Sequence, residues 1–343
     1  MAAQGGVTTT TAQAGSALAC CGVNQQQTRL YLIRQLDGNI GELADTADGW
    51  QSADYAGARP AASSALACCG VGGVHPHAFY LDQAAQLVEL QPDAPSDDPL
   101  PIEVADGSPL AGLALGEKDY RLFYVNADRV LYELVADDGS ARYQEILNGS
   151  SAAPGTRLAC THDSRGLVTV FYVDAADNLL HALHHTSVQV PGEFGNEPIK
   201  GTDPAPGTAL TCFTMTGTND ARAYYLDGQG QIIEVQWKKS TNALTVHPLH
   251  YQAKPGSALT CFGVGGLHTR LYYLDDQAEV TELAWQDGAW HQHSLHVTAA
   301  PDSDLTCYGA DGKWTRLYYL DPQYRVNELA YDGTAKKFVN TAR

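Results

Sequence analysis

A pattern of Leu-x-Cys, an Arg nine residues after the Cys, and a Glu twelve residues after that Arg recurs along the whole chain. Its clearest copy is Leu259, Cys261, the run Arg270 to Asp275, and Glu282. The seven leucines that open the copies are Leu18, Leu66, Leu110, Leu158, Leu210, Leu259 and Leu305. They are 44 to 52 residues apart. A period in that range, with almost no helical patterning, predicts a closed ring of small sheets.

Each repeat contains four short segments that are typical of β-strands. In the sixth repeat they are Ala258 to Phe262, Thr269 to Leu274, Glu279 to Trp285 and Trp290 to Leu295, separated by turns rich in Asp and Gly. The sequence therefore predicts an all-β fold, a seven-bladed β-propeller of four-stranded antiparallel blades. We expect one domain over residues 1–343. Its blades are expected to start near residues 16, 64, 108, 156, 208, 257 and 303.

Ring closure has two interpretations. Either the leader Val7 to Thr11 adds a strand to the last blade, or Lys337 to Asn340 completes that blade alone.

Charge and hydropathy exclude several function classes. The chain carries 39 acidic and 21 basic residues, a formal charge of −18, which disfavours binding to nucleic acid or to an anionic membrane surface. No apolar run approaches the roughly 18 residues of a membrane-spanning helix. The first twenty residues lack the basic and apolar regions of a signal peptide. We therefore expect a cytoplasmic, non-classically secreted or already trimmed protein without membrane insertion, and leave oligomerisation open.

Six of the eight cysteines occupy one repeat position, two residues after the repeat leucine. A residue that keeps the phase of a repeat has the same role in each blade, most often that of a small buried side chain. This placement favours core thiols over disulfides. No Cys-x-x-Cys spacing supports a metal site, and no cofactor motif is present.

An Arg and a Glu recur on the second and third strands of five blades. These pairs are Arg29 with Glu42, Arg121 with Glu133, Arg222 with Glu234, Arg270 with Glu282, and Arg316 with Glu328. With a turn centred near Asp276, Arg270 and Glu282 are expected opposite each other on one face. The second blade has His77 with Glu89, and the fourth has Thr169 with His181.

Spacing alone leaves two interpretations of these pairs. A cross-strand salt bridge would help to hold the hairpin, at about 0–1 kcal/mol if exposed. A sugar clamp would offer donors and acceptors to neighbouring hydroxyls, with an aromatic platform for the sugar's C–H face. Without further information, the structural interpretation is favoured.

The run Thr269-Arg270-Leu271-Tyr272-Tyr273, the Glu twelve residues after Arg270, and the following Ala-Trp-Gln-Asp-Gly-Ala-Trp resemble the repeat of the fungal and bacterial fucose-specific lectins of the Aleuria-lectin type. The resemblance covers all seven units in outline and is specific in the fifth to seventh. It implies that the Arg and Glu of one blade hold L-fucose while aromatic residues of the next blade pack on the sugar. The family is typically six-bladed, and some members have an aromatic residue where this chain repeats Cys.

Residue by residue, the resemblance implies three complete sites. They are Arg222 and Glu234 with Trp285 and Trp290, Arg270 and Glu282 with Tyr331, and Arg316 and Glu328 with Trp50 across the ring closure. Arg29 with Glu42 and Arg121 with Glu133 lack a matching aromatic, His77 with Glu89 is a degraded site, and the fourth blade is expected to be inactive. Trp237 would face that inactive site, where blade packing is its favoured role.

Three functions follow. The first is a non-enzymatic, multivalent lectin whose partners are fucosylated glycans. The second is a biosynthetic enzyme on the same scaffold, of the hetero-Diels–Alderase type, with one elaborated pocket that positions reactants. The third is a protein-interaction propeller that uses its acidic faces. Five retained Arg–Glu pairs favour the lectin, because an enzyme would be expected to keep one pocket and lose the rest.

Overall fold

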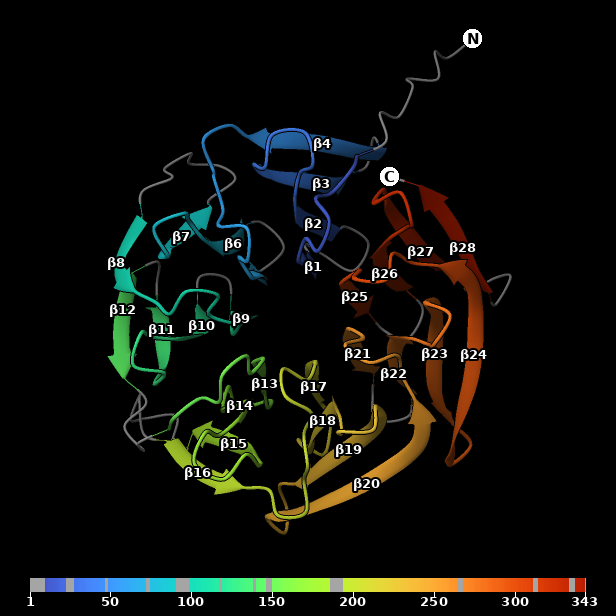
Figure 1. Ribbon diagram of the computed structural model, residues 1–343. Coiled ribbons are helices and arrows are strands. Elements are labelled where there is room, and N and C mark those ends of the chain that lie inside the picture. Colours follow the sequence, from blue (N-terminus) through green and yellow to red (C-terminus); the bar gives the residue numbers. More distant parts are fainter. Residues whose placement is uncertain are drawn as a thin grey trace.

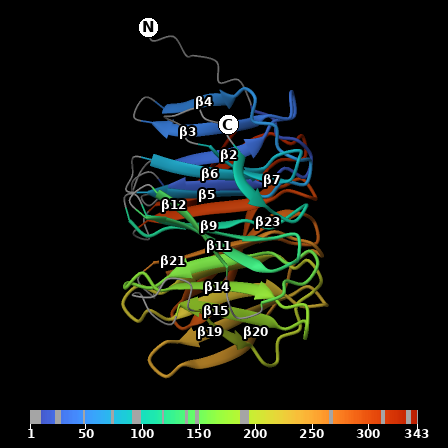
Figure 2. The same ribbon diagram turned by 90° about the vertical axis from the view of Figure 1, so that its left-hand side faces the viewer.

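The computed structural model describes residues 10–22, 28–46, 49–71, 75–90, 99–116, 119–137, 140–145, 150–185, 194–264, 268–310, 314–332 and 337–342. In these residues it contains seven four-stranded antiparallel sheets arranged around a central axis (Figure 1). The predicted seven-bladed β-propeller is confirmed. Figure 2 turns the ring edge-on and shows the strands running across its thickness. Within the described ranges no helix is long and apolar enough to cross a membrane.

The innermost strand of each blade lines the axis (Figure 1). These strands are β1 (Leu18–Gly22), β5 (Leu66–Val71), β9 (Ala111–Ala114), β13 (Ala159–His162), β17 (Leu210–Thr214), β21 (Leu259–Val264) and β25 (Leu305–Ala310). The second strands are β2 (Thr28–Ile33), β6 (His75–Leu81), β10 (Tyr120–Val125), β14 (Val168–Val173), β18 (Ala221–Leu226), β22 (His268–Leu274) and β26 (Trp314–Leu320). We number the blades 1 to 7 in this order.

The third and outer strands complete each sheet toward the perimeter. The third strands are β3 (Ile40–Thr46), β7 (Gln86–Leu90), β11 (Leu131–Asp137), β15 (Leu180–His185), β19 (Gln231–Lys238), β23 (Glu279–Gln286) and β27 (Val326–Asp332). The outer strands are β4 (Gly49–Tyr55), β8 (Pro99–Glu103), β12 (Ser140–Glu145), β16 (Phe194–Pro198), β20 (Ala243–Gln252), β24 (Ala289–Thr298) and β28 (Lys337–Ala342).

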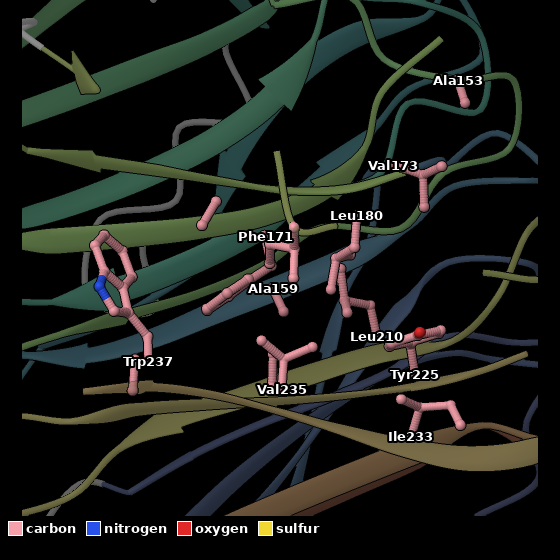
Figure 3. Close-up of a cluster of buried hydrophobic side chains, with 14 residues drawn as sticks. Ala153, Ala159, Phe171, Val173, Leu180, Leu210, Tyr225, Ile233, Val235 and Trp237 are labelled. Carbon is pink, nitrogen blue, oxygen red and sulfur yellow. The ribbon is translucent and has the colours of Figure 1, made fainter. Parts of the chain in front are cut away.

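The hydrophobic core is divided among the seven gaps between neighbouring blades. Each gap holds its own cluster of buried side chains, contributed by the facing sides of two sheets. Figure 3 shows the cluster between blades 4 and 5, in which Phe171 and Leu180 face Val235 and Ile233. Because a sheet buries both faces only when it has a neighbour on each side, the ring must close for every blade to be stable.

In the described residues the ring closes through packed side chains of blades 7 and 1 and through backbone hydrogen bonds between residues 10–12 and blade 7. β28, from the C-terminal end, is the outer strand of blade 7, as the second interpretation expected. Residues 7–9 of the expected leader strand lie outside the described residues, and Thr11 forms only an isolated bridge to Arg325. Next to it, the Ala12 N–H donates to the Tyr324 carbonyl at 2.8 Å. The N–H of Ala299 makes the equivalent bond to Ala278 in blade 6, so the leader replaces the connector between blades 7 and 1.

A buried hydroxyl fastens the start of every blade to its second strand. The hydroxyl oxygens of Ser16, Ser64, Ser108, Thr156, Thr208, Ser257 and Ser303 accept, at 2.8 to 2.9 Å, from the backbone N–H groups of Ile33, Leu81, Val125, Val173, Leu226, Leu274 and Leu320. All seven hydroxyl residues are buried. This bond is not among the sequence-based expectations, although Ser or Thr recurs two residues before each repeat leucine.

Replacing Ser257 by alanine should lower the free energy of unfolding by about 1–2 kcal/mol, because the buried Leu274 N–H would lose its acceptor. Urea denaturation measures this change. Ser257→Thr is the matched control, since Thr156 and Thr208 make the same bond in blades 4 and 5, and it should stay near the wild-type value. Equal losses in both variants would contradict the role of the hydroxyl.

All eight cysteines are free thiols, and four of those at the repeat position line the central channel, namely Cys20, Cys68, Cys160 and Cys212. Cys21 and Cys69 are buried and the other six are half-buried. In three gaps the thiol lies 3.2 Å from a threonine hydroxyl of the preceding blade, for example Cys307 Sγ from Thr260 Oγ1. Burial raises the pKa of Cys20 and of Cys261 to about 12, so both thiols are protonated at neutral pH.

Candidate functional site

The register of the second and third strands differs from the predicted one by two residues. Tyr272, not Arg270, lies opposite Glu282, and Arg270 lies opposite Ala284. The predicted centre near Asp276 is wrong because the turn closes with Ala278 in the left-handed region at φ 58°, which places its centre one residue later. A shift of two residues keeps Arg270 and Glu282 on the same face, so the diagonal pair forms and a tyrosine joins it.

The gap between blades 5 and 6, junction 5/6, contains the first predicted site. Arg222 Nη1 lies 2.6 Å from Glu234 Oε1, and the Tyr224 hydroxyl donates to the same oxygen at 2.8 Å. The other carboxylate oxygen accepts from Gln236 Nε2 at 2.6 Å. Glu234 is 3% exposed, so its orientation is held by three donors in a poorly solvated place.

The two predicted tryptophans of blade 6 face this group. Trp290 packs edge-on against Tyr224 with ring centroids 6.0 Å apart, and Trp285 packs against Trp290 at 5.5 Å. The Tyr251 hydroxyl donates to the Trp290 carbonyl at 3.0 Å. Both indoles are half-buried, so part of each ring is accessible to solvent. The structure therefore brings together all four residues predicted for this junction.

Junction 7/1 contains the predicted site that crosses the ring closure. Arg316 Nη1 lies 2.8 Å from Glu328 Oε1, and the Arg316 guanidinium carbon lies 6.0 Å from the centre of the Trp50 ring. Trp50 also packs edge-on against Tyr318 at 6.0 Å. Asp45, which the sequence analysis missed, pairs with Arg316 Nη2 at 2.6 Å. The repeat spacing could have identified Asp45, because it follows Glu42 by three residues and so occupies the position that Trp285 has after Glu282.

Junction 6/7 is more loosely held. Arg270 Nε lies 3.4 Å from Glu282 Oε1, which accepts from the Tyr272 hydroxyl at 3.0 Å. Burial raises the pKa of Glu282, and the positive charge of Arg270 offsets part of that effect.

Phe338 is the aromatic residue of blade 7 that contacts this group, and it packs in turn against the predicted Tyr331. Phe338 packs edge-on against Tyr272 at 6.2 Å and against Tyr331 at 5.5 Å. Phe338 lies opposite Tyr331 as Trp290 lies opposite Trp285. The sequence analysis missed it because the blade-7 hairpin has a longer loop and lacks the Asp-Gly-x-Trp spacing.

Junction 1/2 keeps its predicted pair without an aromatic residue from the next blade among the described contacts. Arg29 Nη1 lies 2.6 Å from Glu42 Oε1, and the Tyr55 hydroxyl, from the same blade, donates to Glu42 Oε2 at 2.6 Å. In junction 2/3, His77 Nδ1 contacts Glu89, and Tyr120 of blade 3 covers the His77 ring at 4.6 Å.

Junction 3/4 has a different arrangement of the predicted pair. Arg121 Nε lies 3.4 Å from Glu133 Oε1, while Arg121 Nη1 pairs with Asp137 at 3.0 Å. The imidazole Nε2 of His185 lies 3.6 Å from Glu133, which is 1% exposed. His185 packs against Phe194 at 4.3 Å, so this junction has an imidazole in place of the tryptophan.

In blade 4, the counterpart of the clamp glutamate is Ala182. The expectation of His181 there is wrong, because the β14–β15 turn holds one extra residue, as does the β2–β3 turn. His181 instead lies opposite Tyr172, and its Nε2 contacts Asp177.

Three side chains at the β14–β15 turn are close enough to hold a metal ion. Asp174, Asp177 and His181 offer ligand atoms within 4.8 Å of one another. Asp174, however, also accepts the Ala176 N–H, as Asp227 accepts the Gln229 N–H in blade 5. Turn geometry accounts for this group.

A cavity of about 460 Å³ lies at one mouth of the central channel. The turns that precede the innermost strands line it, and its charged residues are Arg157, Asp302 and Asp304. The residues of the Arg–Glu pairs do not contribute to its lining, so the junctions and the channel are separate parts of the molecule.

Comparison with known proteins shows which family the chain belongs to. The sequence model of the fungal fucose-specific lectins matches residues 103–314. The BP39L lectin of Burkholderia pseudomallei has a similar structure, with a TM-score of 0.76 and 16% identity over 96% of this chain and 99% of that one. The six-bladed Aleuria aurantia lectin has a TM-score of 0.61 at 18% identity, over 97% and 96%. AofleA of Arthrobotrys oligospora has a TM-score of 0.64 and 14% sequence identity, over 96% of this chain and 86% of that one. No curated protein matches significantly.

Fold and family together define a carbohydrate-binding lectin built as a β-propeller. The chain belongs to the fungal fucose-specific lectin family, with seven blades where the Aleuria aurantia lectin has six.

Proposed function

We propose that the protein binds L-fucose, and glycans that carry it, at junctions 5/6, 6/7 and 7/1. The observation that supports this most is the recurrence of a buried glutamate, an arginine and a tyrosine next to a half-buried aromatic ring of the following blade. Similar proteins were solved with fucosides, the SapL1 lectin with α-methyl fucoside and an Aleuria aurantia lectin variant with α-methyl-L-fucoside.

The chemistry of each junction suits a sugar that has hydroxyls on one side and an apolar surface on the other. The carboxylate accepts hydrogen bonds from hydroxyls, and the guanidinium donates to hydroxyl or ring oxygens. The aromatic ring packs against C–H groups. Because the glutamate is already held by its tyrosine or arginine, little side-chain entropy is lost on binding.

Repetition of the sites around the ring would raise the avidity for a surface that carries many glycans. Several weak sites on one rigid body can engage a glycan-coated surface together, and avidity then exceeds the single-site affinity by about 10²–10⁴. The proposed partners are therefore surfaces that display many fucosylated glycans.

Isothermal titration with methyl α-L-fucoside should show binding with about three sites per chain, one for each complete junction, at affinities on the order of micromolar to millimolar. In the Trp290→Ala variant, about one of those sites should weaken at least tenfold, because Trp290 is the ring that faces Tyr224. Methyl α-D-mannoside is the control sugar. No heat with the fucoside at millimolar concentration, or equal heats with both sugars, would refute fucose recognition.

A further inference from the structure

Junction 4/5 lacks every polar group of the Arg–Glu clamps. Thr169 occupies the position of the arginine, Ala182 that of the glutamate, and Phe171 that of the buried tyrosine. A sugar here would find no carboxylate at the clamp position to accept its hydroxyl protons. The junction has therefore lost the chemistry of the fucose clamp, whichever sugar the other junctions bind.

A cation enters this junction from the opposite blade. Lys239, directly after β19 of blade 5, places its Nζ 3.5 Å from Thr169 Oγ1. The same ammonium lies 3.5 Å from the centre of the Trp237 ring, a cation–π contact. Since Thr169 replaces the arginine of other blades, Lys239 brings positive charge back to this position from across the gap.

The ammonium forms no direct ion pair with the carboxylates described around it, although the negative charge of Asp163 acts on it from a greater distance and raises its pKa. Asp163 Oδ2 accepts from the Arg165 side chain, whose Nη2 lies at 2.6 Å, and Asp163 Oδ1 accepts from the backbone N–H groups of Arg165 and Leu167. Asp220 accepts the backbone N–H of Lys239 at 3.0 Å. Within the described part of the chain, no carboxylate lies within ion-pair distance of the ammonium. Burial lowers the pKa of Lys239 to about 8, so it remains mostly charged at neutral pH.

A second polar side chain of the junction, His184, lies against the same indole. The His184 ring packs against Trp237 at 4.5 Å, and its Nδ1 is buried with no hydrogen bond. Burial and the nearby Lys239 lower the pKa of His184 to about 4, so the imidazole is neutral at pH 7. Trp237, at one end of the cluster in Figure 3, is 1% exposed and serves as the floor of the junction rather than as a platform.

We propose that junction 4/5 binds the carboxylate of an acidic sugar, with the ammonium of the half-buried Lys239 as the donor and the buried hydroxyl of Thr169 holding that ammonium in place. An ammonium whose described partners are a hydroxyl oxygen and an aromatic ring favours an anion over a neutral hydroxyl, because a charge-assisted hydrogen bond is the stronger one. The formal charge of −18 makes most of the surface repulsive to anions. An anionic ligand would therefore be drawn to the few places where a positive charge has no carboxylate in direct contact, and Lys239 is such a place. The proposal uses no clamp residue, so it is independent of fucose binding.

Uronic acids and sialic acids share this chemistry, and titration separates them. D-glucuronate and N-acetylneuraminate are titrated into the whole chain at pH 7 and constant ionic strength, with glucose as the uncharged control. Wild-type protein should bind one of the acids and not glucose. Lys239→Met should weaken that binding at least tenfold, while Lys238→Met, at the exposed neighbouring lysine, should leave it unchanged. Binding of methyl α-L-fucoside should be the same in all three proteins.

Three results would overturn the proposal. They are no binding of either acid at about 10 mM, equal weakening in both lysine variants, and displacement of the acid by inorganic sulfate at equal concentration with no preference for the sugar. If Lys239→Met lowers the yield of folded protein, Thr169→Val gives a second test, because it removes the hydroxyl that accepts from the ammonium and should also weaken acid binding. If the wild-type protein bound glucuronate but no fucoside, the result would refute fucose binding by the Arg–Glu pairs and leave the proposal for junction 4/5 standing.

Discussion

Replacing Arg222, Arg270 and Arg316 together by alanine should remove saccharide binding at the three complete junctions. Each guanidinium is the charged donor beside a buried glutamate, and loss of such a hydrogen bond costs about 1.5–3 kcal/mol, or roughly 10- to 100-fold in affinity per site. Titration calorimetry with methyl α-L-fucoside measures the loss, and each single variant should remove about one third of the sites.

The matched control changes the same amount of charge at another place in the hairpins. Arg34, Arg129 and Arg325 lie at the β2–β3, β10–β11 and β26–β27 turns, so their triple alanine variant should keep all fucoside sites. Circular dichroism on both triple variants shows whether the propeller is intact. Retained binding in the clamp variant, or an equal loss in the control, would show that the Arg–Glu pairs only hold the hairpins.

Replacing Gly70 by alanine should destabilise the ring more than the other changes suggested here. A Cβ at Gly70, in the innermost strand of blade 2, would lie 2.2 Å from the backbone carbonyl oxygen of Gly22 in blade 1. Backbone in a neighbouring sheet yields less easily than a side chain, so the cost should be about 3 kcal/mol. For a chain of this length, the thermal midpoint should fall by about 4 °C.

Gly228→Ala is the matched control for this prediction. No heavy atom lies within 4 Å of a Cβ built on Gly228, and its φ is ordinary for an L-residue. Its unfolding free energy should stay within about 0.5 kcal/mol of the wild type. If the two alanine variants have the same unfolding free energy, close contact between the innermost strands does not limit the stability of the ring.

The repeat predicted the number of blades and the position of the strands because both depend on local pattern. Alternation of apolar residues, Asp at the turns and Gly between strands act over a few residues, so each blade can be recognised by itself. The spacing paired Arg222 with Glu234, and the resemblance to the fucose-specific lectins added Trp290 of the next blade to that pair. The grouping could be carried over because blades that are neighbours in sequence are neighbours in space.

The details of the junctions did not follow from spacing in the same way. One extra residue in the β14–β15 turn moves Ala182, not His181, to the clamp position. A longer loop before Phe338 hides its equivalence to Trp290. Turn length changes register without changing composition, and a slip of one residue turns a side chain to the other face of the sheet.

By itself the sequence determined the repeat, the seven blades and the residue types offered at each gap, since these are set by local periodicity and turn chemistry. Only the tertiary structure decided which of them meet. Asp45 reaches Arg316 across the closed ring, and Lys239 reaches Thr169 across a gap between two blades. Such pairs depend on the register of two hairpins and on the packing of one sheet against the next. No repeat unit contains that information alone.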